Sequence, residues 1–190
     1  MRRDYRVTTR AAVITEGIPG EKEQARSERM ASISIIGPVV HGGREYVLER
    51  VVHPPTQGGE PEATFERHLR EDETGLYGSD WAESDPLSAD ERRYLAYPLT
   101  EGLRWEPMAD SSTVLEAVRR EIVTVPAGRF DAWRIDLRLQ FEPGFGNSYD
   151  EWYGSAGLIR SIGHLETELG TVPRSRRIRE ITWELVATSE

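Results

Sequence analysis

The segment that most limits the possible folds is a run of alternating residues that follows a turn signature. The turn signature is Pro126-Ala127-Gly128, and large apolar side chains then recur at every second position. These apolar residues are Trp133, Ile135, Leu137, Leu139 and Phe141. A period of two places alternate side chains on opposite faces of an extended chain. Residues 131–141 are therefore predicted to form a half-buried β-strand whose bulky side chains face an apolar interior, while the arginines and the aspartate between them face water.

Further strands are predicted where the same period recurs between turns rich in glycine and proline. Their ranges are 4–14, 24–36, 45–52, 62–77, 111–124, 149–153, 158–168 and 177–187. The first two are expected to pair as a hairpin. The apolar positions of 62–77 and 111–124 also fit a helical period. We expect strand in both, because 111–124 leads into the β-branched run from Ile122 to Val125.

One short helix is predicted near the middle of the chain. Ser88 and Glu91 form a capping-box pattern, in which the two side chains bond free N–H groups at a helix start. Pro98 limits this helix to two or three turns. The expected fold is therefore mainly β, with about ten strands in a single large curved antiparallel sheet, either a half-barrel or an open barrel. Residues 1–190 are expected to form one domain.

Composition argues against several classes of function. The net charge of −9 argues against a nucleic-acid partner, which requires a basic surface to neutralise phosphates. The sequence has no cysteine, which excludes disulfides, zinc–thiolate sites and thiol nucleophiles. Its apolar residues alternate with polar ones, so no transmembrane segment is expected. The basic cluster Arg174–Arg179 is interpreted as a solvated turn and edge strand, and no role is predicted for it.

The first residues leave the cellular compartment open. Arg2 and Arg3 are positively charged, but strand-like alternation begins at Tyr5 in place of the apolar stretch of a signal peptide. The chain as given is therefore expected to lack a signal peptide. Two locations remain: the cytoplasm, or the periplasm or extracellular space if the sequence is an excised mature domain. The sequence does not predict an oligomeric state.

No metal, cofactor or catalytic motif is found. Four histidines stand at no ligand spacing, so neither a metal nor a cofactor is predicted. They are His41, His53, His68 and His164. Glu151, which precedes Trp152, would carry a raised pKa if it pointed into the protein, as general acids often do. The alternative interpretation of Glu151 is a solvated carboxylate at a strand edge, and no catalytic residue is predicted.

Three turn and packing motifs between residues 95 and 165 resemble those of a bacterial domain of unknown function. They are Tyr97-Pro98-Leu99 with Trp105, the hairpin Val125-Pro126-Ala127-Gly128-x-Phe130, and Trp152-Tyr153 with Gly157 to Arg160. Proteins with this pattern are usually exported, and they are similar in fold to the lipoprotein-carrier (LolA/LolB-like) half-barrels. The resemblance implies an antiparallel sheet around a hydrophobic concavity, which in the carriers holds acyl chains.

Aromatic side chains are the remaining functional signal, because large rings form either a core or the wall of a ligand site. The candidate ligand-binding residues are Trp105, Trp133, Leu137, Trp152, Trp183 and Arg160. Arg160, or Arg134 or Arg138, would lie near the rim and bind an anionic head group.

Three functional hypotheses follow. The leading one is a non-enzymatic binding protein of the bacterial envelope that holds a lipid-like or amphipathic molecule, or a protein partner. The first alternative is a small cofactor-free enzyme on the same sheet, which requires an inward Glu151 or His164 beside a polar partner. The second alternative is a structural module that pairs through an edge strand.

Overall fold

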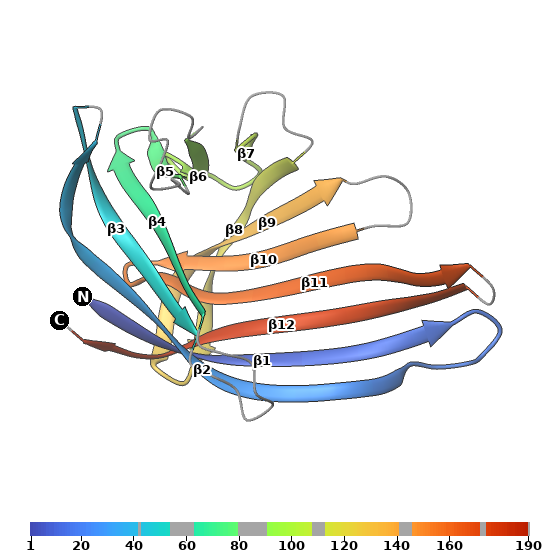
Figure 1. Ribbon diagram of the computed structural model, residues 1–190. Coiled ribbons are helices and arrows are strands. Elements are labelled where there is room, and N and C mark those ends of the chain that lie inside the picture. The colour runs from blue at the N-terminus through green and yellow to red at the C-terminus, as the bar shows by residue number, and fades with distance from the viewer. Residues whose placement is uncertain are drawn as a thin grey trace.

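The computed structural model describes residues 1–41, 43–53, 63–79, 91–107, 113–140, 146–171 and 174–189. Twelve strands in these ranges form one antiparallel sheet (Figure 1). They are β1 (Arg2–Thr15), β2 (Lys22–His41), β3 (Arg44–His53), β4 (Ala63–Asp72), β5 (Gly75–Ser79), β6 (Arg92–Ala96), β7 (Arg104–Trp105), β8 (Thr113–Val125), β9 (Gly128–Gln140), β10 (Gly146–Gly154), β11 (Gly157–Thr171) and β12 (Arg174–Ser189). The prediction of a mainly β fold with one large antiparallel sheet is confirmed.

The strand order is β6-β5-β4-β3-β2-β1-β12-β11-β10-β9-β8-β7. Strands that pair in the sheet are therefore consecutive in the chain, except that β1 and β12 meet at its centre. The consecutive strands β6 and β7 form its two edges. Arg2 lies opposite Ser189 at one end of that central pair, and Thr15 lies opposite Ser175 at the other. The first and last strands thus join two meanders, and the two chain ends lie side by side (Figure 1).

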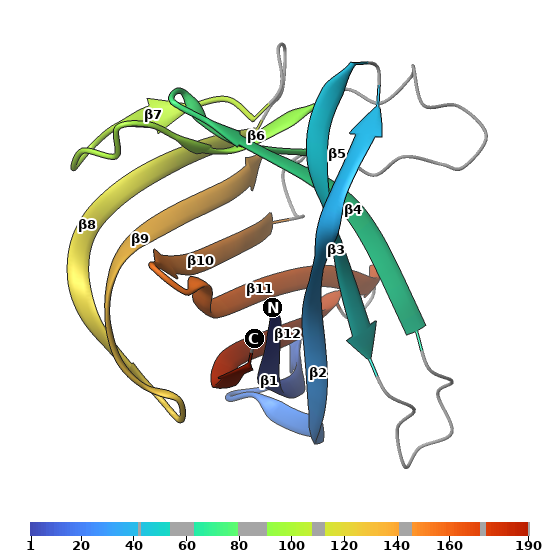
Figure 2. The ribbon, with the colours of Figure 1, turned by 90° about the vertical axis from the view of Figure 1, so that its left-hand side faces the viewer.

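The sheet curls into a nearly closed barrel (Figure 2). Register shifts interrupt seven of the eleven described strand pairings, and each such irregularity bends and twists its strand locally. The two sheet edges meet where the backbone N–H of Arg93 donates to the carbonyl of Pro107 at 2.8 Å. The indole of Trp105 also donates to the carbonyl of Arg93 at 3.0 Å. The half-barrel or open barrel of about ten strands that we expected is thus a nearly closed barrel of twelve strands.

Two apolar clusters form the core. The first contains Tyr5, Val7, Ala31, Ile33, Val123, Val125, Ala132, Trp152, Ile159 and Leu185. The second contains Leu95, Ala96, Trp105, Leu115, Ala117 and Ile135, with Trp133 and Leu137 packed against it. The alternation predicted for residues 131–141 therefore holds in the described part of β9.

The polar side chains of β9 are more buried than its alternating pattern predicts. The side chains of Arg134 and Asp136 are only 26% and 16% exposed, because Arg134 is ion-paired with both Asp136 and Asp150. Asp136 and Asp150 lie directly opposite each other on β9 and β10. Cross-strand pairing of this kind lets charged residues occupy a half-buried face of a sheet. Arg138, which is 75% exposed, faces water as expected.

The predicted short helix is wrong for the residues that the structure describes there. Residues 92–96 form β6, which pairs with β5 and buries Leu95 and Ala96. Ser88 lies outside the described residues. A capping box contributes little beside a paired, buried strand, and a helix of two turns is marginal without tertiary support. No helix occurs among the described residues, and hence none of the length and apolarity needed to cross a bilayer.

Two further expectations are corrected. The Arg174–Arg179 cluster lies on β12, which is a central strand between β1 and β11 and not an edge strand. Sequence patterns show which residues alternate but not which strands pair, so the position of β12 was not evident. The strand predicted to end at Gly37 and Pro38 continues to His41, because a register shift between Ile36 and Pro38 accommodates the proline.

Candidate functional site

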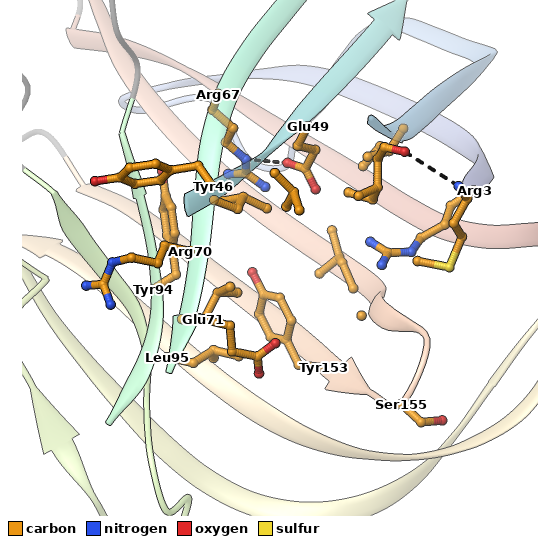
Figure 3. Close-up of a pocket in the computed structure, with 18 of the residues that line it drawn as sticks. Arg3, Tyr46, Glu49, Arg67, Arg70, Glu71, Tyr94, Leu95, Tyr153 and Ser155 are labelled. Carbon is orange, nitrogen blue, oxygen red and sulfur yellow. Dashed lines mark hydrogen bonds and ion pairs between the residues drawn. The ribbon is translucent and has the colours of Figure 1, made fainter. Parts of the chain in front are cut away.

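Two cavities lie within the curl of the sheet, and they share Ile33, Arg67 and Leu158 as wall residues. The first has a volume of about 600 Å³ and lies between β1–β6 and the turn that joins β10 to β11 (Figure 3). We call it the polar cavity because charged and tyrosine side chains line much of it. The second has a volume of about 700 Å³ and lies between β2–β4 and β10–β12. We call it the aromatic cavity.

The aromatic cavity has an apolar wall that is open to solvent. Its apolar residues are Ile33, Val51, Phe65, Leu158 and Trp183. Phe65 remains 60% exposed although it is a large apolar residue. The ring of His53 lies edge-on to Phe65 and to Trp183, with ring centres 5.8 Å and 5.1 Å away. An exposed apolar wall inside a concave site is typical of a ligand-binding surface.

A buried ion pair lies between the two cavities, because Arg67 lines both of them and its partner Glu49 lines the polar cavity. Glu49 and Arg67 lie directly opposite each other on β3 and β4, and the guanidinium of Arg67 donates to the Glu49 carboxylate. Glu49 is only 3% exposed, so this charge depends on Arg67 for its stabilisation. Arg67 also lies over the ring of Tyr94, 4.9 Å from its centre. Burial alone would lower the pKa of Arg67, but Glu49 outweighs it and holds that pKa above its ordinary value.

Glu151 lines the aromatic cavity from β10. Its carboxylate accepts a hydrogen bond of 2.8 Å from the Tyr153 hydroxyl. Burial raises the pKa of Glu151, and the nearby Tyr153, Arg67 and Ser161 offset only part of that rise. Burial also raises the pKa of Tyr153 well above its usual range, so its hydroxyl remains a donor. The inward position that the enzyme hypothesis requires is therefore present for Glu151.

A glycine shapes the wall beside Glu151. Tyr149 lies directly opposite Gly163, and a Cβ atom at Gly163 would lie 2.7 Å from the Tyr149 ring. The absence of a side chain at Gly163 therefore lets the tyrosine ring lie against β11. Burial raises the pKa of Tyr149, and the neighbouring Glu151 adds to the rise.

The predicted ligand-binding residues are divided between cavity and core. Of the six, Trp183 lines the aromatic cavity. Trp133 and Leu137 lie opposite Tyr153 and Tyr149, and thus on the cavity face, but they pack against the second core cluster. Trp105 is 7% exposed within that cluster. A ligand contact for these residues remains a prediction.

Trp152 and Arg160 lie on the opposite face of the sheet from Glu151. Successive residues of a strand point to opposite faces, so Trp152 enters the first core cluster while Glu151 enters the cavity. The Trp152 indole donates a 2.7 Å hydrogen bond to Glu121. The guanidinium of Arg160 lies 5.4 Å from the centre of the Trp152 ring. That of Arg134 lies 5.8 Å from the same ring centre. Arg160 and Arg134, two of the three arginines expected at a ligand rim, therefore cover a core tryptophan in the geometry of a cation–π contact.

The histidines are dispersed. His53 lies in the aromatic cavity, where burial and then the charge of Arg29 lower its pKa. His164 is exposed and lies 3.8 Å from Glu180, so it is not the inward residue of the enzyme hypothesis. His68 lies against the Tyr46 ring, and the side chain of His41 is outside the described residues. In the described ranges, no three His, Asp or Glu side chains converge as metal ligands would.

Sequence reasoning missed Glu49, Phe65 and Arg67 as cavity residues. The predicted strand 45–52 did not show which of its residues face inward, whereas pairing places Glu49 opposite both Ile35 and Arg67. A buried glutamate cannot be distinguished from a solvated one by alternation. An arginine at the matching position of the next strand was the only available signal, and it depended on knowing the register.

Comparisons with known proteins show a similarity in fold and do not show a function. No protein-family model and no curated protein sequence matches the chain. A protein from Bacteroides fragilis NCTC 9343, proposed to be exported and of YmcC-like fold, has a similar crystal structure. Its TM-score is 0.50 at 12% identity, over 98% of this chain and 95% of that one.

A second similar structure is that of a proposed lipoprotein from Parabacteroides distasonis ATCC 8503. It has a TM-score of 0.45 at 11% identity, over 95% of this chain and 93% of that one. The specific hairpin motif and the similarity to LolA/LolB-like carriers stay predictions. The chain is thus similar in fold to a protein of YmcC-like fold.

Proposed function

We propose that this protein is a non-enzymatic binding protein that holds an amphipathic molecule in the aromatic cavity. The proposal rests on the exposure of Phe65. This large apolar side chain stays 60% exposed in a concave wall that also contains Trp183. An apolar chain placed there would remove this surface from water, which contributes about 25 cal/mol per Å². The polar floor beside it, with Glu151 and Arg67, gives such a ligand an orientation.

The bacterial envelope is the proposed setting. The similar structure from Bacteroides fragilis belongs to a protein proposed to be exported, and this supports an envelope location for the present chain. An acidic protein that presents an apolar cavity within a nearly closed sheet fits the transport or storage of a poorly soluble molecule.

Truncation of Phe65 tests the proposal. We expect 1-decanol to bind the wild-type protein and Phe65→Ser to weaken that binding about tenfold, because the alcohol's chain loses its largest exposed apolar contact. Isothermal titration calorimetry measures both affinities. Since Phe65 is already exposed, the unfolding midpoint should change little.

The matched control is Ile122→Ser. Ile122 is 56% exposed on β8 and does not line the aromatic cavity, so its removal should leave decanol affinity unchanged. The proposal fails if decanol does not bind, or if both variants reduce its affinity equally.

A second candidate function is acid–base catalysis without a cofactor. It is favoured by the inward Glu151, whose carboxylate lies beside a tyrosine donor and near the Glu49–Arg67 pair. A buried carboxyl that keeps its proton near neutral pH can act as a general acid. This candidate therefore depends on the protonation state of one residue.

We predict that Glu151 titrates above the ordinary glutamate pKa of about 4.3. NMR of ¹³C-labelled glutamate carboxyls measures this directly, and Glu151→Gln identifies the resonance. Because the pKa of Glu151 is raised in the folded state, its protonated form stabilises the fold at low pH. That stabilisation is lost as pH rises through the folded pKa.

The unfolding free energy of the wild type should therefore fall relative to that of Glu151→Gln as pH rises. A Glu151 resonance that titrates with the ordinary glutamate pKa would exclude the general-acid role. The binding proposal would survive that result.

The edge-strand hypothesis has less support. The outermost strands, β6 and β7, have five and two residues. They contact each other through the bonds at Arg93, so little of either edge is free among the described residues.

A further inference from the structure

Arg3 is a cation at the wall of the polar cavity. It follows Arg2 on β1, and the two side chains point to opposite faces of the sheet. Arg2 is 58% exposed and donates to Asp4 at 2.9 Å. The guanidinium of Arg3 instead points into the cavity (Figure 3).

Gly157 creates the space that Arg3 occupies. A Cβ atom at Gly157 would lie 2.7 Å from the central carbon of the Arg3 guanidinium. Gly157 also has a φ of 84°, a backbone conformation that residues with a side chain rarely adopt. Arg3 therefore lies against bare backbone at the turn between β10 and β11.

Arg3 has no acidic partner among the described residues. No carboxylate there lies within ion-pair distance of it, and its buried Nε has no hydrogen-bond acceptor. Two other arginines also have a buried Nε without an acceptor, but neither lines the polar or the aromatic cavity. Arg93 donates through another nitrogen to the Thr74 carbonyl, and Arg160 covers the Trp152 ring.

The other two guanidiniums of the polar cavity have carboxylate partners, and the Met1 amino group donates to the Ile35 carbonyl at 3.5 Å. Arg67 is paired with Glu49, and Arg70 is paired with Asp72 and Glu91. Glu71 accepts a hydrogen bond from the Tyr97 hydroxyl at 2.6 Å. Arg3 is thus the cavity guanidinium without a carboxylate partner in the described ranges, and a guanidinium is well suited to bind carboxylate or phosphate.

The neighbourhood of Arg3 connects the two cavities. Arg3 lies opposite Ile33 on β2, and Ile33 and Leu158 line both cavities. Two residues further along β1, the Tyr5 hydroxyl donates to the Leu158 carbonyl at 2.8 Å. The Tyr5 ring contacts that of Trp183, with ring centres 5.8 Å apart.

We infer that Arg3 binds the anionic head group of an amphipathic ligand whose apolar part occupies the aromatic cavity. This inference rests on the proposed function and adds the charge of the ligand to it. The head group is a carboxylate or a phosphate, because both match the planar donor face of a guanidinium. Arg3, and not the arginines of β9 or β11, then selects the ligand.

Calorimetry with matched probes tests the inference. Sodium decanoate and 1-decanol have the same chain and differ in the head group, so their affinities separate charge from chain. Arg3→Gln should weaken decanoate binding about tenfold or more, because a charge-assisted hydrogen bond is lost, and leave decanol binding unchanged. Arg2→Gln, on the outer face, should change neither.

The outcomes separate the two proposals. If neither probe binds, the proposed function fails. If both bind but Arg3→Gln and Arg2→Gln affect decanoate equally, the proposed function stands and the role of Arg3 is wrong. If inorganic phosphate alone binds the wild-type protein, is lost in Arg3→Gln and does not compete with decanoate, the site takes a free anion and the amphiphile assignment is overturned.

Discussion

Replacing Arg67 with methionine is expected to lower the free energy of unfolding by about 3–5 kcal/mol. The substitution leaves Glu49, which is 3% exposed, as an unpaired buried charge. It also removes the positive charge that lowers the pKa of Glu151. Urea denaturation at pH 7 measures the loss.

The same two strands provide the control. Arg50 and Glu66 also lie opposite each other on β3 and β4, but on the other face, where their side chains are 45% and 43% exposed. Arg50→Met should therefore cost less than about 1 kcal/mol, as exposed ion pairs do.

A double variant separates loss of charge pairing from loss of packing. Glu49→Gln combined with Arg67→Met removes both buried charges and should recover most of the stability lost by Arg67→Met alone. A double variant as unstable as Arg67→Met would show that the packing of the Arg67 side chain matters more than its charge.

Truncation of Ile135 is expected to have an effect of similar size. Ile135 is 1% exposed on β9 and belongs to the second core cluster. Ile135→Ala should lower the free energy of unfolding by about 2–5 kcal/mol, because it removes buried apolar contacts and leaves a cavity. Denaturant titration with an unchanged slope would show that the variant still unfolds as a unit.

Ile122→Ala is the matched control for Ile135→Ala. Ile122 is 56% exposed on β8. The same truncation there should change stability by about 0.5 kcal/mol or less, as is usual for surface substitutions. Equal losses at the two positions would contradict the assignment of Ile135 to the core.

The alternation of apolar residues predicted the fold class because it is a local property of a chain beside a core. Residues 131–141 illustrate this, since Trp133, Ile135 and Leu137 share a face whichever strand lies next to them. In their described residues, the segments 62–77 and 111–124 are extended as predicted, although the first is divided by a turn into β4 and β5.

Features that depend on distant contacts were not predicted. Residues 92–96 follow a helix-start pattern, yet pairing with β5 and burial of Leu95 override it. The same holds for β12, whose central place depends on pairing with residues at the far end of the chain, such as Arg2 with Ser189.

The candidate site was predicted less well than the fold. Trp183, which lines the aromatic cavity, was named because an aromatic residue on an apolar face is visible in the pattern. Glu151 was noted only as one of two interpretations, the other being a solvated carboxylate, and it was not predicted as a site residue. Arg3 and Glu49 were missed, because each looks like any charged residue on the polar side of a strand. Only the register reveals that a charge faces inward.

The pairing of β1 with β12 has a consequence for how the barrel assembles. Every other neighbouring pair in the sheet joins consecutive strands, so each meander can form through contacts close in sequence. The single seam between Arg2–Thr15 and Arg174–Ser189 must instead bring distant residues together, and closing so large a loop carries an entropic cost. Since both cavities have walls on each side of this seam, neither can exist before it closes, and ligand binding should report the last step of folding.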